Sequence, residues 1–323
     1  MIEANPNLAQ KTVDFYESAW RAHAFPAFGN RRISTLTAAD LDRFNAAMRA
    51  KPKANGQPRS ETSVKGTYKA VRAVFSYAYK HRLIPFNPCI AVAVPKADTV
   101  EARFLSVAEV MALAAALEKK QPYDLLVRLA AFTGLRIGEV AALRIRDIDL
   151  RAGEVQVRLN KTHTSKGYVT KAPKSRAGRR DVPILDDQLF HDLGMHLRNH
   201  PHRADLEAGL WPGKVPGHAR ISYDYALDPK GFCRNDFKPA CERAGLGDLV
   251  FHELRHTFAT LALESSTLTM FELSRAMGHE SEAITNRVYA HLRKKDYSAH
   301  RARFSAHVAA ASAPSAPIVA LGG

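Results

Sequence analysis

The chain is most informative where it reads His252-Glu-Leu-Arg255-His256-Thr-Phe, from residue 252 to residue 258. In a helix, residues three apart share a face, so His252 and Arg255 are expected to point the same way. Leu254 and Phe258 suggest that another side of this helix is buried. A cation beside an imidazole is costly unless an anion lies between them, so the stretch predicts an anion site. Taken alone, a capping histidine beside a surface arginine explains it equally well.

Two further motifs follow downstream. The first is Met277-Gly278-His279, placed after a helix that Gly278 would end, because glycine readily takes the left-handed conformation at a helix C-terminus. The second is Tyr289, ten residues after His279, within Val-Tyr-Ala-His-Leu. Taken alone, such a tyrosine is typical of a core or interface residue.

An upstream motif supplies a second arginine, in Thr133-Gly-Leu-Arg136-Ile-Gly-Glu139. Arg136 lies between a buried helix, predicted over residues 125–132, and a second helical stretch. An arginine at such a junction can point into a cleft, where its planar guanidinium can hold two phosphate oxygens. Glu139 could orient a neighbouring basic group. In isolation, an ordinary surface ion pair between Arg136 and Glu139 is the simpler interpretation.

In combination, these motifs resemble the tyrosine recombinases, the phage integrase family. They match the family's three sequence boxes and its nucleophile in order and spacing, over about residues 10–300. Each box is moderately specific alone, and the set is highly specific. The resemblance implies six catalytic residues, Arg136, Lys174, His252, Arg255, His279 and Tyr289, with Glu139 and His256 in supporting roles.

The family places its catalytic lysine in the turn of a β-hairpin, before a strand that reads Val-Pro. Lys174, upstream of Val182-Pro183, fits that place. Lys171 is the competing candidate, because one sequence does not fix the register of the hairpin. Residues 161–180 hold seven Lys or Arg and no Asp or Glu, which favours DNA backbone contact over a solvated loop. The DNA-binding residues that we expect are Lys161, Lys166, Lys171, Arg176, Arg179 and Arg180.

The resemblance implies that Tyr289 attacks the scissile phosphate, forming a 3′-phosphotyrosyl ester and a free 5′-hydroxyl. The covalent bond conserves the energy of the broken one, so rejoining needs no ATP. A tyrosine has an ordinary pKa of about 10 and needs a base, for which His252 is predicted. Lys174 is expected to protonate the leaving 5′-oxygen.

The remaining basic residues are assigned to the phosphate. Arg136 and Arg255 would hold its non-bridging oxygens, and His279 would donate a further hydrogen bond. Glu139 would support this geometry without reacting. Neither a metal ion nor a cofactor is expected, because side-chain cations take the place of metal ions.

Composition agrees with a DNA-binding protein. The 323 residues are 46% hydrophobic, carry a formal net charge of +15 and give a pI of about 9.8. This length allows two domains, and this charge favours a nucleic-acid partner over a ribosomal or membrane surface. Cys89, Cys233 and Cys241 lack zinc-site spacing and are interpreted as reduced thiols. The sequence shows no signal peptide and no membrane span, so we expect a cytoplasmic, nucleoid-associated protein.

The predicted fold is mainly α with a small antiparallel β-sheet. Residues 1–98 are expected to be helical, and they resemble the SAM-like core-binding domain of this family. They hold fifteen Lys or Arg against seven Asp or Glu, an excess that favours DNA contact. A linker is expected at about 92–102, followed by an α+β catalytic domain of the DNA breaking-rejoining type at 103–308 and a disordered tail at 309–323. Helices are predicted at 12–24, from Thr37, and at 61–81, 125–132, 185–200, 230–244, 252–264, 269–277, 282–291 and 295–308.

Three short segments are predicted to form the sheet. Residues 154–159 alternate apolar and polar positions, and 168–171 and 180–184 are their expected partners. The Gly- and Pro-rich residues 202–225 are predicted to be irregular, and no function is assigned to them. Ser106 and Glu109 form a predicted capping box at the start of the catalytic domain.

One protomer cuts one strand, so exchange between two duplexes requires four active sites. The resemblance therefore implies a homotetramer on double-stranded DNA. The helix after Tyr289 would pack on a neighbouring protomer, or the tail would fold back onto its own chain. The helical domain begins almost at Met1, which leaves no room for an arm-binding domain and favours a simpler recombinase or a truncated chain.

Two other functions are compatible with part of this pattern. A non-catalytic DNA-binding relative would serve as an accessory protein, but every catalytic residue type is present here. A type IB topoisomerase would use similar chemistry to relax supercoils without strand exchange. The small size of the chain and its helical N-terminal region favour a site-specific recombinase that integrates or excises a phage or mobile element.

Overall fold

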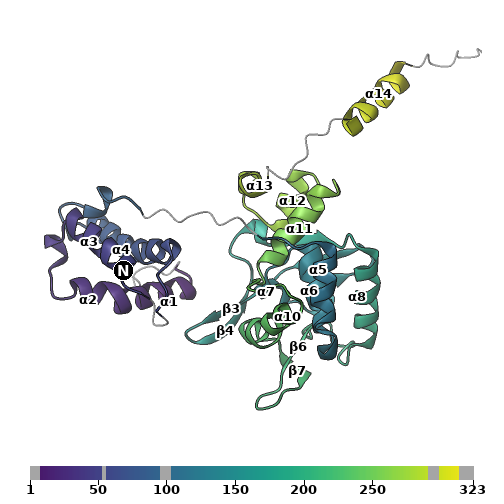
Figure 1. Ribbon diagram of the computed structural model, residues 1–323, viewed down its shortest axis with the longest axis horizontal. Coiled ribbons are helices and arrows are strands. Elements are labelled where there is room, and N and C mark those ends of the chain that lie inside the picture. Colours follow the sequence, from purple (N-terminus) through teal and green to yellow (C-terminus); the bar gives the residue numbers. More distant parts are fainter. Residues whose placement is uncertain (1–7, 53–55, 95–102, 290–297, 313–323) are drawn as a thin grey trace, which may run out of the picture. The chain divides into compact units, whose positions relative to one another are not determined.

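The computed structural model describes residues 8–52, 56–94, 103–289 and 298–312. Helices predominate, with short antiparallel strands between them, as the sequence predicted (Figure 1). The chain divides into two compact units, Met1–Ala102 with Lys161–Lys171, and Arg103–Asn160 with Ala172–Gly323. No helix in the described ranges has the length and apolar character needed to cross a bilayer.

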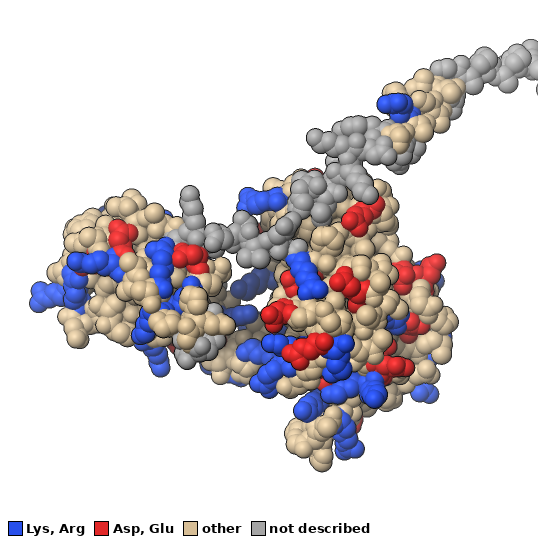
Figure 2. All heavy atoms as spheres, viewed as in Figure 1, with Lys and Arg blue, Asp and Glu red and all other residues tan. Residues whose placement is uncertain are grey.

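The first unit is a helical bundle. Its helical elements are α1 (Gln10–Ala19), a π-helical turn (Trp20–Ala24), α2 (Phe25–Phe28), a 3-10 turn (Ile33–Thr35), α3 (Ala38–Ala50), α4 (Glu61–Lys80) and a 3-10 turn (Pro88–Ile90). The single helix predicted at 12–24 is therefore the middle of a longer, interrupted helical segment. Lys and Arg outnumber Asp and Glu on the face of this unit shown in Figure 2.

Local sequence signals set the ends and the buried face of these helices. Thr37 begins α3 as predicted: the Thr37 hydroxyl accepts the Asp40 N–H at 3.3 Å, and the Asp40 carboxylate accepts the Thr37 N–H at 2.9 Å. Helix α4 buries Val64, Tyr68 and Phe75, which lie at helical spacing. The bundle therefore has its own hydrophobic core.

The second unit contains most of the remaining elements. Its helices are α5 (Val107–Ala115), α6 (Tyr123–Thr133), α7 (Ile137–Val140), α8 (Asp187–Asn199), α9 (Pro229–Phe232), α10 (Lys238–Arg243), α11 (Glu253–Glu264), α12 (Met270–Met277), α13 (Glu282–Tyr289) and α14 (Ser298–Ser312). Its strands are β1 (Ile148–Asp149), β2 (Glu154–Val157), β5 (Arg180–Pro183), β6 (Pro212–Lys214) and β7 (Ile221–Ala226). Short 3-10 or π-helical turns cover Glu118–Lys120, Ile145–Asp147, Arg176–Gly178 and Cys233–Phe237.

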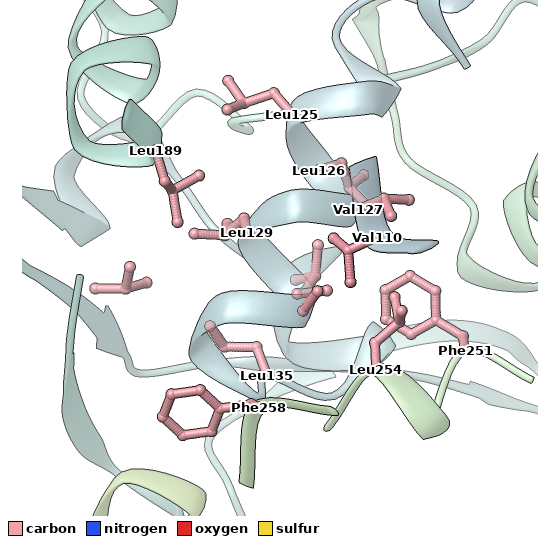
Figure 3. Close-up of a cluster of buried hydrophobic side chains, with 14 of the residues drawn as sticks. Val110, Leu125, Leu126, Val127, Leu129, Leu135, Leu189, Phe251, Leu254 and Phe258 are labelled. Atoms are coloured by element: carbon pink, nitrogen blue, oxygen red, sulfur yellow. The ribbon is translucent and has the colours of Figure 1, made fainter. Parts of the chain in front are cut away.

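Helix α6 lies at the centre of this unit and packs against α5, α8 and α11. Leu126 and Leu129 on α6 are fully buried and belong to the same hydrophobic cluster as Leu254 and Phe258 of α11 (Figure 3). Gly134 ends α6 with a φ of 66°, and a Cβ there would lie 2.6 Å from the Phe258 ring. Only glycine fits this turn. Because it has no side chain, α11 can lie close to the residues that precede Arg136.

The small sheet was only partly predicted. Strand β2 pairs antiparallel with β5, with Val155 opposite Val182, as expected. The prediction that residues 168–171 join this sheet was wrong: β4 (Gly167–Lys171) pairs with β3 (Asn160–Thr164) in a separate hairpin. Ser165 in that hairpin's turn donates its N–H to Asp14 of α1 at 2.8 Å, within the first unit.

Residues 202–225 were predicted to be irregular, which was also wrong in part. They contain β6 and most of β7, which pair antiparallel with a register shift at Pro212 and Gly213. The buried Trp211 stacks on His196 of α8, with ring centroids 5.3 Å apart. This contact attaches the hairpin to the core.

The C-terminal helix α14 runs to Ser312, so the expectation of disorder from residue 309 was wrong for its first four residues. Residues 295–297 of the predicted helix, residues 313–323 of the predicted tail and most of the predicted linker lie outside the described residues.

Candidate active site

Arg136 and Glu139 form the first part of the site. Arg136 is the residue before α7, and its side chain is 40% exposed. Glu139, one turn further on, is buried and accepts the Arg136 backbone N–H and its Nη1, each at 2.9 Å. The pair is therefore not the solvated surface ion pair that Arg136 alone would suggest.

The buried carboxylate of Glu139 has a second partner, Arg180 of β5. Arg180 donates Nη1 to Oε1 at 3.0 Å and Nη2 to Oε2 at 2.9 Å. Burial acts to raise the pKa of Glu139, but the hydrogen bonds and charge of Arg180, with those of Arg136, lower it to about 2. Glu139 therefore stays ionised between two guanidinium groups.

Arg255 of α11 is 2% exposed. It donates Nη1 to the Gly134 carbonyl at 2.8 Å and Nη2 to the Met277 carbonyl. A guanidinium has five N–H groups, so the two hydrogen bonds to carbonyls leave three N–H groups that can bind an anion. Burial, together with the charges of Arg136 and Arg180, lowers the pKa of Arg255 to about 9. The crowded positive charge would be relieved by a bound anion.

His279 follows Gly278, which ends α12 in the left-handed conformation with a φ of 64°, as predicted. The Nδ1 atom of His279 lies 2.7 Å from the hydroxyl of Thr285, a fully buried residue of α13. Burial, and then the charges of Arg255 and Arg136, lower the pKa of His279 to about 4. The ring is therefore neutral at pH 7 and held by Thr285.

Tyr289 is the last residue of α13 and is 3% exposed. Its hydroxyl lies 2.5 Å from Nδ1 of His256, on α11. Burial raises the pKa of Tyr289 to about 12, and the charge of Arg255 opposes that rise. The phenol is protonated at pH 7 and is placed to donate its hydrogen to His256.

His252 lies one helical turn before His256, and their ring centroids are 5.3 Å apart. The His252 side chain is exposed on one side and packed against its neighbours on the other. Desolvation by these neighbours, and then the charges of His256 and Arg255, lower the pKa of His252 to about 4. Burial also lowers the pKa of His256 from its ordinary value. The structure thus places His256, and not His252, next to the Tyr289 hydroxyl.

A cavity of about 470 Å³ joins residues of the separate motifs. Arg136, Glu139, Lys174, Gly278 and His279 are among the residues that line it. Lys174 is exposed and lies between β4 and β5, so it is in the connection that leads from β2 towards its partner strand β5. Lys171 ends β4 and does not line this cavity.

The basic run at residues 161–180 is split between the two units. Lys161, Lys166 and Lys171 belong to the β3–β4 hairpin, and Lys161 lies over the ring of Tyr168 at 5.4 Å. Arg176 and Arg179 are exposed and line a second, larger cavity of about 960 Å³, which His279 also lines.

Arg180, one of the residues expected to contact DNA, is buried. Its side chain is 6% exposed and is held by Glu139 and by the Ala276 carbonyl. These partners hold the guanidinium within the protein, although Arg180 is also among the residues that line the 960 Å³ cavity. The basic run concealed this burial, because the other six cations of the run all precede Arg180 and five of them are exposed.

Thr285 was missed in the sequence. It lies four residues before Tyr289, and both are buried on the same face of α13. The four-residue spacing could have indicated this role in the sequence, because two residues on the same buried face of a helix can reach the same site.

Comparison with known proteins identifies the family. Residues 103–184 and 230–296 match the sequence model of the phage integrase family. The prophage phiRv2 integrase of Mycobacterium tuberculosis is 30% identical over 277 residues, which cover 85% of this chain and 70% of that one. The chain belongs to the phage integrase family. It is a tyrosine recombinase, as the order of its motifs predicted.

Solved integrase structures show the same fold. The Tn1549 transposon integrase in complex with a circular intermediate DNA has a TM-score of 0.72 and 19% identity, and the match covers 94% of this chain and 96% of that one. A lambda integrase tetramer bound to a Holliday junction has a TM-score of 0.61 and 19% identity, covering 91% and 74%.

Proposed function

We propose that this recombinase cleaves and rejoins DNA at specific sites through a covalent bond between Tyr289 and a phosphate. The hydrogen bond between Tyr289 and His256, beside the buried Arg255, carries this proposal. It brings a potential nucleophile, a potential proton acceptor and a cation together within one chain.

The proposed phosphate site uses Arg136, Arg255 and His279. Arg136 and His279 line the 470 Å³ cavity, and Arg255 is bonded to the carbonyl two residues before His279. Fixed donors around a phosphate would stabilise the extra charge of the five-coordinate transition state. The lowered pKa values of Arg255 and His279 support this site, because both residues lie in a field of positive charge.

In the proposed step, the Tyr289 oxygen bonds to phosphorus and the bond to the 5′-oxygen breaks. The phenol proton goes to a histidine, and the 5′-oxygen takes a proton from Lys174. The products would be a 3′-phosphotyrosyl ester and a 5′-hydroxyl. Attack by a 5′-hydroxyl of another strand reverses the step and completes strand exchange, so no ATP is consumed.

His256 is our candidate for the proton acceptor, and His252, which the sequence favoured, is the alternative. His256→Ala is expected to slow single-turnover cleavage by about 100-fold, and His252→Ala by less. Measuring both rates at saturating DNA tests the assignment. A larger loss for His252→Ala would return the role to His252, since hydrogen bonds in a site without substrate can rearrange when substrate binds.

Lys174 is proposed as the general acid, ahead of Lys171. Lys174→Ala is expected to slow cleavage by about 10² to 10³-fold. A substrate with sulfur in place of the bridging 5′-oxygen should remove most of this defect, because a thiolate leaves without a proton at neutral pH.

The matched comparison is Lys171→Ala. It is expected to weaken DNA binding and reduce the salt dependence of binding, without a defect that the sulfur substrate corrects. Rescue of Lys171→Ala, with no rescue of Lys174→Ala, would reverse the assignment.

Double-stranded DNA is the proposed partner, with exposed Lys166, Lys171, Arg176 and Arg179, and Lys161, in contact with its backbone. We further propose that four protomers assemble on two duplexes, because each protomer offers one nucleophile and exchange breaks four strands. Helix α14 is the proposed contact with a neighbouring protomer.

A strand-exchange assay tests the function. Duplexes that carry candidate sites from the DNA flanking the gene would be incubated with the protein, without ATP, and the products separated by size. Recombinant products support the proposal. Relaxation of any supercoiled plasmid without exchange would instead indicate a topoisomerase, and binding without cleavage an accessory protein.

A further inference from the structure

We propose that Arg180 is a positioning residue for strand cleavage. It holds Glu139, and Glu139 in turn fixes the direction of the Arg136 guanidinium. This inference rests on the proposed function, which assigns Arg136 to the scissile phosphate.

The contacts form a continuous chain from β5 to the cavity. Each carboxylate oxygen of Glu139 accepts one N–H from Arg136 and one from Arg180, at distances of 2.9 to 3.0 Å. A carboxylate with all four of these bonds has little freedom to rotate. The Arg136 side chain is 40% exposed, and its Nη1 donates to Glu139 Oε1 at 2.9 Å, a contact that anchors the guanidinium.

Arg180 also links this pair to the two other segments of the site. Its Nε donates to the Ala276 carbonyl at 2.6 Å, three residues before His279, and its Nη1 donates to the Gly178 carbonyl at 3.2 Å. Gly178 lies four residues after Lys174. One guanidinium thus joins the segments that carry Arg136, Lys174 and His279.

The packing around Arg180 leaves it little room to move. A Cβ on Gly278 would lie 3.0 Å from its Cδ and 3.1 Å from its Nη1. Its side chain is 6% exposed and that of Glu139 is 3% exposed. Four of the five N–H groups of Arg180 donate to protein acceptors. The side chain is thus committed mainly to its protein neighbours, which favours an effect on cleavage through them.

Loss of Arg180 should also change how Glu139 titrates. Burial favours the protonated carboxyl, and Arg136 would remain as its hydrogen-bond donor, with the charge of Arg255 nearby. The pKa of Glu139 would then rise, and a protonated Glu139 could no longer accept all the N–H groups of Arg136. The charged or titratable groups that act on Glu139 or line the same cavity are Arg136, Lys174, Arg180, His252, Arg255, His279 and Glu280.

The test is single-turnover cleavage of a nicked suicide duplex by Arg180→Gln, at saturating DNA, across pH 5 to 8. Cleavage is expected to be about 100-fold slower than wild type, because the reacting groups are misplaced by a fraction of an ångström or more. The DNA dissociation constant should stay close to that of wild type. The defect should deepen as pH falls, and this added pH dependence should be absent in Arg180→Gln/Glu139→Gln.

Arg128→Gln is the matched control. Arg128 is 8% exposed and pairs with Asp192 at 2.7 Å, but it lines neither cavity. This variant should lose thermal stability and keep the wild-type cleavage rate per folded molecule. If Arg180→Gln does not fold, Arg180→Lys is tested in the same assay. Its ammonium group keeps the positive charge but cannot make the paired hydrogen bonds of a guanidinium, so cleavage should still be slow.

Two results would overturn the inference. One is a wild-type rate with reduced stability alone, which would make Arg180 purely structural. The other is a defect confined to DNA affinity, which would make it a DNA contact. Failure of the proposed function is separately visible, because wild-type protein would then form no covalent adduct, and the inference would fall with it.

Discussion

Tyr289→Phe is expected to abolish the covalent protein–DNA adduct. The substitution removes the only atom of this side chain that can bond to phosphorus, and the other groups of the site cannot replace a nucleophile. The expected loss is at least about 10⁴-fold, as for other enzymes that lose a covalent nucleophile. The measurement is denaturing electrophoresis of a labelled, nicked suicide duplex after incubation with each protein.

The variant should fold and bind DNA. Phenylalanine keeps the buried ring and loses one hydrogen bond to His256, worth about 1 kcal/mol. Tyr123→Phe is the matched control, since Tyr123 is also buried and donates its hydroxyl to the Pro212 carbonyl at 3.1 Å. An adduct with Tyr289→Phe, or its loss in Tyr123→Phe at unchanged folding, would contradict the assignment of the nucleophile.

Features set by neighbouring residues were predictable from the sequence. Thr37 with Asp40, and Ser106 with Glu109, form capping boxes where the sequence placed them. Gly278 ends α12 in the left-handed conformation, so the position of His279 after a turn was also predictable. These signals depend on residues at most a few positions apart, and tertiary contacts did not override them.

Strand pairing was not predictable in the same way. The β3–β4 hairpin is polar, with no buried apolar alternation to fix its face or partner. The β6–β7 hairpin has a register shift and a Gly/Pro-rich sequence, which hid its strands. Their pairing depends on turns and on distant contacts such as Trp211 with His196.

The roles of Arg180 and His256 also depend on distant partners. Arg180 meets Glu139 across 41 positions of sequence, and His256 meets Tyr289 across 33. A sequence pattern gives residue types and spacing along one element. It therefore identified the basic residues of the site but not which of them is buried, or which histidine reaches the nucleophile.

Arg255→Lys is expected to slow cleavage by about 10³-fold. Lysine keeps a positive charge, but it cannot donate to the Gly134 and Met277 carbonyls and also to a phosphate through a planar fork. Loss of those bonds would also loosen the turn that carries His279. The measurement is the single-turnover cleavage rate with DNA in excess, compared with the DNA dissociation constant.

The pH dependence of cleavage by Arg255→Lys is a second, independent test of this prediction. The same surroundings that lower the pKa of Arg255 to about 9 leave the guanidinium charged at pH 7. An ammonium starts from a lower ordinary pKa, about 10.4, so in this position it should lose its proton near neutral pH. Activity of Arg255→Lys should therefore fall as pH rises from 6 to 8, where Arg255 itself stays protonated. A rate near that of wild type, with no added pH dependence, would show that the charge at Arg255 suffices and its fork does not matter.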